Sequence, residues 1–246
     1  MARQARDLGD SGFLHVKQRG IGQQLLFEVP EDYRYYLKVL QKYSKETGVT
    51  VCAYCLMENH THLLLYDTRQ KIPELMKKIG VGYSYYFNQK YERVGHLFQD
   101  RYRSEVVEDD AGLMMVVRYI LNNPREAGIC PAKDYPWSSY GDYGDRSAFT
   151  YHDTIEGLLG DKASFEKYIA EENGDRCMEY GFKSRHDDRW AMKVIHRQLK
   201  GKSGTSLQGL GHDERDAALR KLKAAGLSVR QLERLTGINR GAIQRA

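Results

Sequence analysis

The chain has 246 residues, 41% of them hydrophobic and 29% charged, which is ordinary for a globular protein with one sizeable core and a small appended module. Its apolar runs fall far short of the roughly 20 residues that a membrane helix needs. The basic N-terminus lacks the apolar segment of a signal peptide. Four scattered cysteines are too few for a disulfide framework. We therefore expect a cytoplasmic protein with reduced thiols and no membrane partner.

Hydrophobic patterning predicts a first unit of strands and helices. Strands are expected at 13–18, 25–29, 50–57, 61–66, 97–99 and 102–107, and helices at 31–46, 72–90 and 111–122. Glu58 and Asn59 suit a hairpin turn, and Pro124 is expected to stop the third helix. Such strand runs usually form one antiparallel sheet with helices on one face, which is an α+β fold.

A CxxC motif lies within the strand expected at 50–57. Its Cys52 and Cys55 stand in the apolar run VCAYCLM, where a regular strand would point them to opposite faces. No second CxxC follows, and Cys130 and Cys177 lie far away. We therefore interpret Cys52 and Cys55 as buried apolar side chains, and zinc binding or redox chemistry is the alternative.

Charge divides the rest of the chain. Residues 141–180 hold 10 acidic and 4 basic residues, with a short helix expected around 163–172, whereas residues 181–246 hold 15 basic and 6 acidic residues. A basic C-terminal segment favours a nucleic-acid partner. We expect a catalytic domain at 1–143, an acidic connector at 144–210 and a basic module at 211–246.

The last module is predicted to be a helix-turn-helix. Helices are expected at 214–225, at 228–235 and from 240 onward, with a tight turn at 236–239. This arrangement would place Asn239, Arg240 and Gln244 toward a DNA major groove. The alternative is a small helical bundle that packs on the catalytic domain or mediates oligomerisation.

The motif NHTHLLL (59–65) contains the first candidate site. Residues two apart on a strand share a face, so His60 and His62 would project together. Neutral imidazoles bind zinc and metals of the Mg²⁺ and Mn²⁺ type. The alternative is a pair of histidines that alternate by chance on a solvent-exposed face.

The motif RYILNNPR (118–125) contains the second candidate site. Tyr119 and Asn123 are four residues apart, so a helix would bring them to one face. The phenol could act as a nucleophile and the amide oxygen as a third metal ligand. Two points weigh against this: Asn123 precedes Pro124, which disfavours helical geometry, and Tyr119 could be a packed aromatic residue.

Four motifs in this order, NHTHLLL, GHLFQDRY, RYILNNPREAG and YPWSSY, resemble the REP-associated tyrosine transposases of the IS200-like, single-tyrosine branch of HUH endonucleases. The resemblance covers roughly residues 13–143. It implies a ferredoxin-like antiparallel sheet with the histidine pair on a central strand and the tyrosine on a nearby helix. Two positions depart from the family: Thr61 replaces a bulky apolar residue and Glu58 a common proline.

The resemblance also implies a chemistry. Mg²⁺ or Mn²⁺ would be held by His60, His62 and Asn123, with Tyr119 as the nucleophile that forms a 5′-phosphotyrosine. The implied target is single-stranded or hairpin DNA at repeated extragenic palindromes.

Aromatic and basic residues are interleaved where single-stranded DNA could bind. The aromatic residues are Tyr83, Tyr85, Tyr86, Phe87, Tyr91 and Phe98, about half of which we assign to packing. Lys90 and Arg93 accompany them. The side chains that we expect to contact DNA are Arg101, Arg103, Arg118, Arg125, Arg240 and Gln244.

The sequence thus predicts a metal-dependent DNA endonuclease and strand transferase, associated with the nucleoid. One alternative is a DNA-binding regulator that keeps the fold without cutting. Another is a zinc hydrolase, which would need a third strong ligand and a general base. The sequence leaves open whether the protein acts as a monomer or as a homodimer.

Overall fold

The structure is a computed structural model that describes residues 10–171, 188–200 and 204–246, so Cys177 lies outside the described residues. Its contacts divide the chain into two compact units. The first comprises Met1–Ile21 and Leu25–Tyr180, and the second comprises Gly22–Gln24 and Gly181–Ala246. The segment expected to be a connector is therefore shared between the units. Its boundaries as a functional segment stay a prediction.

The first unit is built on a four-stranded antiparallel sheet. Its strands are β1 (Phe13–Arg19), β2 (Thr50–Met57), β3 (His60–Tyr66) and β4 (Arg103–Val106). They lie in the order β2-β3-β1-β4, with every neighbouring pair antiparallel. The predicted hairpin between β2 and β3 is confirmed, and β3 lies inside the sheet. An α+β fold with an antiparallel sheet is therefore confirmed.

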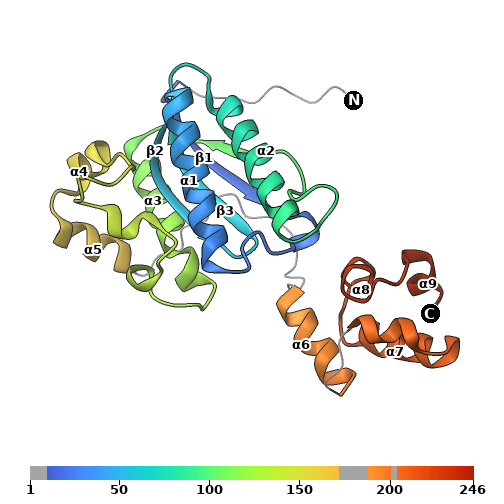
Figure 1. The fold of residues 1–246 in the computed structure, drawn as a ribbon. Helices are drawn as coiled ribbons and strands as arrows, with labels where there is room; N and C mark the ends of the chain where they lie inside the picture. The colour runs from blue at the N-terminus through green and yellow to red at the C-terminus, as the bar shows by residue number, and fades with distance from the viewer. Residues whose placement is uncertain (1–9, 172–187, 201–203) are drawn as a thin grey trace. The chain divides into compact units, whose positions relative to one another are not determined.

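Helices cover both faces of this sheet, so the expectation of helices on one face is wrong. In Figure 1, α1 (Pro30–Thr47) and α2 (Ile72–Lys90) lie in front of the sheet and α3 (Asp110–Glu126) lies behind it. Leu63 and Leu65 belong to the core under α1 and α2, whereas Leu64 belongs to the core with α3. Three consecutive buried leucines are typical of a strand that is covered on both faces.

Two expected strands are absent from the described residues. Segment 25–29 is an irregular stretch in which Leu26 and Phe27 are fully buried, and both of their amides donate to the Glu58 carbonyl, at 2.7 and 3.1 Å. Segment 97–99 forms only an isolated bridge between Phe98 and Gly20. In both places the apolar side chains are buried by loop packing, which hydrophobic patterning cannot distinguish from a strand.

The CxxC cysteines lie in one cluster, contrary to the expectation of opposite faces. A β-bulge between Val51 and Ala53 shifts the register of β2, and Cys52 and Cys55 both pack in the core beside α3. Burial raises the pKa of the Cys52 thiol to about 12 and raises that of Cys55 as well. Both are therefore buried, protonated thiols.

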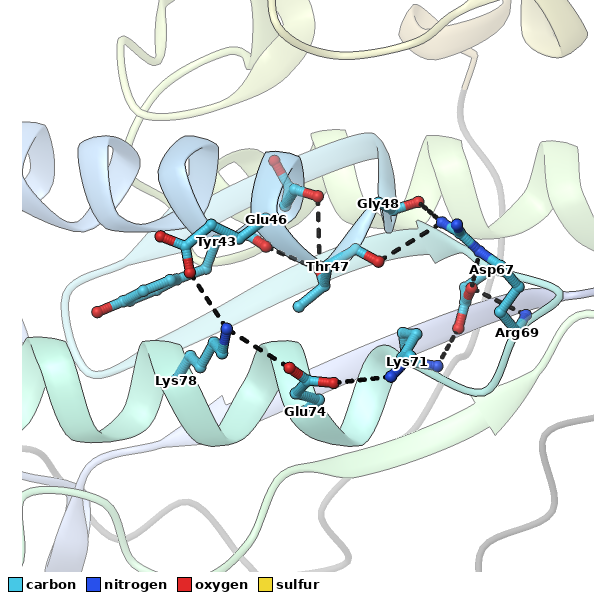
Figure 2. Close-up of polar contacts among 10 residues, drawn as sticks. Tyr43, Glu46, Thr47, Gly48, Asp67, Arg69, Lys71, Glu74 and Lys78 are labelled. Carbon is cyan, nitrogen blue, oxygen red and sulfur yellow. Dashed lines mark hydrogen bonds and ion pairs between the residues drawn. The ribbon is translucent and has the colours of Figure 1, made fainter.

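A polar cluster ties the end of α1 to the start of α2 (Figure 2). Gly48, with φ of 71°, ends α1, and the Arg69 guanidinium donates to its carbonyl at 2.7 Å. The Lys78 ammonium lies 3.1 Å from Glu46 on α1 and 3.4 Å from Glu74 on α2. Such exposed ion pairs contribute little individually because solvent screens them, but they fix the register of the helix pair.

A second, buried network lies at the other end of this helix pair. The Asp32 carboxylate is fully buried and accepts hydrogen bonds from Lys90 (2.6 Å), Tyr91 (2.6 Å) and Tyr86 (3.0 Å) of the α2 region. It also accepts from two backbone amides of the turn before α1. Asp32 therefore caps α1 and holds α2 against it.

The remaining elements of the first unit follow α3. They are α4 (Asp153–Leu159), α5 (Lys162–Ala170) and short 3₁₀ turns at Ala132–Asp134 and Ser139–Asp142, with another such turn at Ile21–Gln23 where the units meet in sequence. The Tyr135 hydroxyl donates to the Leu56 carbonyl at 2.7 Å. The segment YPWSSY thus packs along β2, where Ser138 also forms a bridge with Cys55.

The second unit is helical. It contains α6 (Asp188–Gln198), a 3₁₀ turn at Gly204–Gly209, α7 (His212–Ala224), α8 (Val229–Thr236) and α9 (Arg240–Arg245). A capping box of Ser228 and Gln231 starts α8, and Gly237, with φ of 69°, ends it. The three predicted helices are confirmed. Across both units, no described helix combines the length and apolarity needed to cross a bilayer.

Candidate functional site

Two histidines project from β3 toward α3. His60 and His62 alternate with Thr61, which is fully buried on the opposite face, where its hydroxyl lies 3.5 Å from that of Tyr36. The rings of His60 and His62 lie 5.0 Å apart. The pair therefore shares one face, and the departure at Thr61 does not touch it.

Tyr119 meets this pair from α3. Its ring lies 5.5 Å from that of His62, nearly perpendicular to it at 75°. The side chain is half-buried at the edge of the core and is not enclosed within it. The structure thus brings the predicted nucleophile beside the predicted metal ligands, although the two motifs are 57 residues apart in sequence.

Asn123 lies one turn after Tyr119 in a regular helix. The expectation that Pro124 stops α3 is wrong, because the helix continues through Pro124 to Glu126. Proline removes one backbone donor from the helix, and the Asn123 amide donates to the Tyr119 carbonyl at 2.8 Å. The Asn123 side chain also hydrogen-bonds His60. Three of the predicted site residues are therefore linked directly.

A third histidine, which the sequence did not single out, supports the pair. His15 on β1 is fully buried, and its Nε2 lies 2.9 Å from Nδ1 of His62. Its Nδ1 lies 4.0 Å from the carboxylate of Glu105 on β4. The alternation FLHVKQR placed His15 on a strand face, but only the β1–β3 register reveals that this face carries the site.

The same register adds two cations. Lys17 lies directly opposite His62, and Arg19 lies opposite His60. Lys17 opposes protonation of all three histidines and Arg19 opposes that of His60, and both cations make this face electropositive. Sequence reasoning missed both residues because their strand partners were unknown.

All three histidines are neutral. Burial, followed by the charge of Lys17, lowers the pKa of His15 to about 3. Burial likewise lowers the pKa of His60 to about 3, with further lowering by Lys17 and Arg19 and an opposing hydrogen bond from Asn123. The pKa of His62 is lowered well below its usual value, mainly by burial. Neutral imidazoles keep the lone pair that a metal ligand needs.

The donor set fits a cation with oxygen and nitrogen ligands. Nε2 of His62 is buried and has no hydrogen-bond partner in the structure. His60 is oriented by a contact of 2.7 Å between its Nδ1 and the Asn59 amide oxygen, and its ring also hydrogen-bonds the Asn123 side chain. Within the described ranges, no group of three or more His, Cys, Asp or Glu is placed to hold a metal. The Asn123 side chain, which hydrogen-bonds His60, is the third candidate ligand.

The predicted DNA-binding residues lie in several different parts of the structure. Arg103 on β4 lies directly opposite Lys17, so it shares the face of the histidines. Arg118 stacks on Tyr168 at 4.3 Å and lies 3.6 Å from Glu171. Arg125, on the same helix, donates to a carbonyl at the end of α5. The structure does not bring Arg118 and Arg125 to the histidines, so DNA contact by them stays a prediction.

The other predicted DNA contacts lie elsewhere. Arg101 is exposed in the loop before β4 and lines a separate cavity beside α2. Arg240 and Gln244 are exposed on α9 of the second unit. The Asn239 side chain caps α9 by accepting from the Ala242 amide at 2.9 Å, and this bond competes with a role in base recognition.

The aromatic run of α2 mostly serves packing. Tyr83 and Phe87 are fully buried in the core, and Tyr86 and Tyr91 are held by Asp32. Tyr85, in contrast, is 69% exposed. More than half of these aromatic side chains therefore pack within the fold, whereas we expected about half.

Comparisons with known proteins agree with this geometry. Residues 24–123 match the family described as "Transposase IS200 like", a segment that includes both histidines of β3 and ends at Asn123. No curated protein matches the chain significantly. The fold is similar to a solved structure of a REP-associated tyrosine transposase bound to a REP hairpin. That likeness has 14% sequence identity and a TM-score of 0.55, and it covers 75% of this chain and 99% of the other.

A structure described as a transposase candidate from Deinococcus radiodurans R1 shares 19% identity, over 49% of this chain and 97% of the other, but its TM-score of 0.35 is too low for a fold argument. The matched segment includes β2, β3 and β4 of the sheet and most of α3, the helix that carries Tyr119. Residues 24–123 are thus similar to the IS200-like transposase family, and the likeness of the whole chain to the REP-associated structure is one of fold.

Proposed function

We propose that the chain is a metal-dependent, single-tyrosine endonuclease and strand transferase that acts on single-stranded or hairpin DNA. The observation that carries this proposal is the position of the Tyr119 ring, 5.5 Å from His62 on an electropositive sheet face. The strand order β2-β3-β1-β4, with α1 and α2 on one face, supports a ferredoxin-like description of the domain, to which α3 is added.

The chemistry needs a nucleophile, charge neutralisation and a leaving group. The Tyr119 phenol would lose its proton to solvent, and its oxygen would attack the scissile phosphorus and form a 5′-phosphotyrosine bond. The bond to the 3′-oxygen would break, and that oxygen would take up a proton from solvent. Lys17 and Arg19 would attract and orient the phosphate from β1. The covalent link keeps the phosphodiester bond energy, so a second 3′-hydroxyl can attack and rejoin the strand without ATP.

A divalent cation would be held by His60, His62 and Asn123, and Mg²⁺ or Mn²⁺ suits this mixed nitrogen and oxygen set. When bound, it would polarise the scissile phosphate and offset charge on the departing oxygen. The protein's part is to keep both imidazoles neutral and aimed. Burial keeps both imidazoles neutral, a contact with Asn59 orients His60, and a contact with His15 orients His62.

Hairpin DNA is the proposed substrate because the similar structure described above is that of a protein bound to a REP hairpin. Arg103 extends the electropositive face toward β4. In the second unit, α8, the turn at Gly237 and α9 form the proposed helix-turn-helix. Arg240 and Gln244 are exposed there to contact duplex DNA.

The test is a covalent-adduct assay. A panel of hairpin oligonucleotides, labelled on the 3′ side of the expected break, is incubated with protein and Mg²⁺ or Mn²⁺ and resolved on a denaturing gel. Wild-type protein should form a labelled adduct and Tyr119→Phe should form none. Tyr85→Phe, which alters an exposed tyrosine outside the site, is the matched control and should behave as wild type. Hairpin binding without an adduct under either metal would instead identify a non-cleaving regulator.

A further inference from the structure

A cavity of about 800 Å³ lies on the side of the sheet opposite the histidines. Its walls are the part of α2 around Lys77 and Val81 and the loop from Gly95 to Tyr102. Its volume is within the range of small-ligand sites. None of the residues that we place in the cutting reaction lines it.

The floor of the cavity carries an unsatisfied amide. Gln18 on β1 lines the cavity, is only 6% exposed, and its Oε1 has no hydrogen-bond partner among the residues that the structure describes. Gln18 pairs in register with Thr61, so it faces away from Lys17 and Arg19. A buried acceptor without a partner costs free energy. A ligand that donates a hydrogen bond into the cavity would remove this cost.

A glycine of α2 lies beside the amide. Gly80 lies within α2, where glycine is unfavourable by about 1 kcal/mol relative to alanine. A Cβ built on Gly80 would meet one atom within 4 Å, Nε2 of Gln18, at 3.7 Å. The other glycine of this segment, Gly82, is explained by helix packing, because a Cβ at that position would lie 3.3 Å from the Tyr43 ring. Gly80 therefore lies directly beside the Gln18 amide, and a large side chain at this position would fill the space next to that amide.

The rest of the lining suits a nucleotide. Lys77, His96 and Arg101 are exposed along the rim, with Asp100 as an acidic neighbour. The half-buried ring of Phe98 offers an aromatic wall. Cations that meet phosphates beside an aromatic ring that stacks on a base are the features of single-strand binding sites.

The geometry points to a base-binding pocket for single-stranded DNA, in which the Gln18 amide reads the edge of an amino-bearing base such as adenine. A glutamine amide can accept from the adenine amino group and donate to N7. This inference rests on the proposed function. The pocket adds a site of base specificity to the proposed nuclease, because Gln18 lies between Lys17 and Arg19 in β1 and projects from the opposite face of the same strand.

The loop that forms the pocket is also joined to the end of β1. The Gln99 amide donates to the Arg19 carbonyl at 2.9 Å, and Phe98 forms a bridge with Gly20. On the other side, the Gly20 amide donates to the carbonyl of Asn59, the residue that orients His60. A strand held in the pocket would thus be anchored to the backbone that carries the cutting site.

The test measures DNA binding without cutting. Fluorescein-labelled (dA)10 and (dT)10 are titrated with full-length protein in EDTA and followed by anisotropy. Wild-type protein should bind (dA)10 more tightly. Gln18→Leu should weaken (dA)10 binding by about tenfold and abolish the preference over (dT)10. Gly80→Leu, which fills the pocket, should have the same effect, and Gln89→Leu, at an exposed position of α2, should have none.

Thermal unfolding separates binding from folding. Gln18→Leu should be at least as stable as wild type, because it removes an unpaired buried acceptor. Equal affinity for both oligonucleotides in the wild type, unchanged binding by Gln18→Leu, or a marked loss of stability in that variant would overturn the pocket. If dAMP alone bound as tightly as (dA)10, the assignment of the pocket to a DNA strand would be overturned. The adduct assay is read separately, so either proposal can fail while the other stands.

Discussion

Replacing His15 with leucine should weaken metal binding without removing a metal ligand. His15 contacts His62 through the 2.9 Å bond between Nε2 and Nδ1. If a cation holds Nε2 of neutral His62, then Nδ1 must carry the proton and donate it to His15. This bond fixes both the tautomer and the ring angle of His62, and its loss would leave a buried donor without a partner.

The expected size of the effect follows from two estimates. A buried polar group that loses its partner costs about 1–3 kcal/mol. Loss of a residue that orients a metal-binding histidine typically lowers metal affinity by about 10- to 100-fold, which is about 1.4–2.7 kcal/mol. The two ranges overlap, so we expect His15→Leu to weaken Mn²⁺ binding by at least about tenfold. His15→Gln, which can return a polar atom near Nε2, should restore part of it.

The assay is a Mn²⁺ titration followed by electron paramagnetic resonance of the unbound ion. The matched control is His152→Leu, because His152 is also buried and its Nε2 lies 2.7 Å from the Thr150 hydroxyl, in a different part of the unit. That variant should lose comparable stability and bind Mn²⁺ like wild type. Wild-type affinity in His15→Leu would refute the orienting role, and equal weakening in both variants would show a general loss of packing.

Two further predictions concern the framework. Burial raises the pKa of Asp32, but hydrogen bonds from Lys90 and neighbouring groups outweigh burial and leave the pKa below its usual value. The ionised carboxylate therefore contributes its full stabilisation of the fold above about pH 4, and this contribution is lost as the pH falls further. Asp32→Asn should cost about 3 kcal/mol in urea unfolding at pH 7, and an equal loss at pH 2.5 would contradict the linkage. Iodoacetamide should label half-buried Cys130 in the folded protein but label Cys52 and Cys55 only after unfolding, as peptide mapping by mass spectrometry can check.

Local patterning predicted the elements that depend on local physics. The helices α1 and α2 and the hairpin of β2 and β3 follow from apolar spacing, proline and glycine positions, and a polar turn. The same patterning failed at residues 25–29, where Leu26 and Phe27 are as buried as strand residues but are held by one carbonyl. Burial alone does not specify a ladder of hydrogen bonds.

The site required long-range information that no local pattern contains. His60, His62 and Tyr119 were found because their motifs occur together, whereas His15, Lys17 and Arg19 were not. Nothing in FLHVKQR says which strand it pairs with, and a shift of one residue would send all three to the other face. The Cys52 bulge illustrates the same limit, because one extra residue in β2 overrode the expected alternation.

Asn123 joins the two halves of the site for a reason that lies in its neighbour. Pro124 cannot donate a backbone hydrogen bond, yet α3 continues past it. The Asn123 amide donates to the Tyr119 carbonyl and contacts His60, so one side chain steadies the helix end, the nucleophile's backbone and a metal ligand. A substitution at Asn123 therefore perturbs helix and ligand set together. His62 differs from Asn123, because its Nδ1 contacts His15 whereas its Nε2 has no hydrogen-bond partner among the described residues, so a cation would bind a ring nitrogen that the fold does not use.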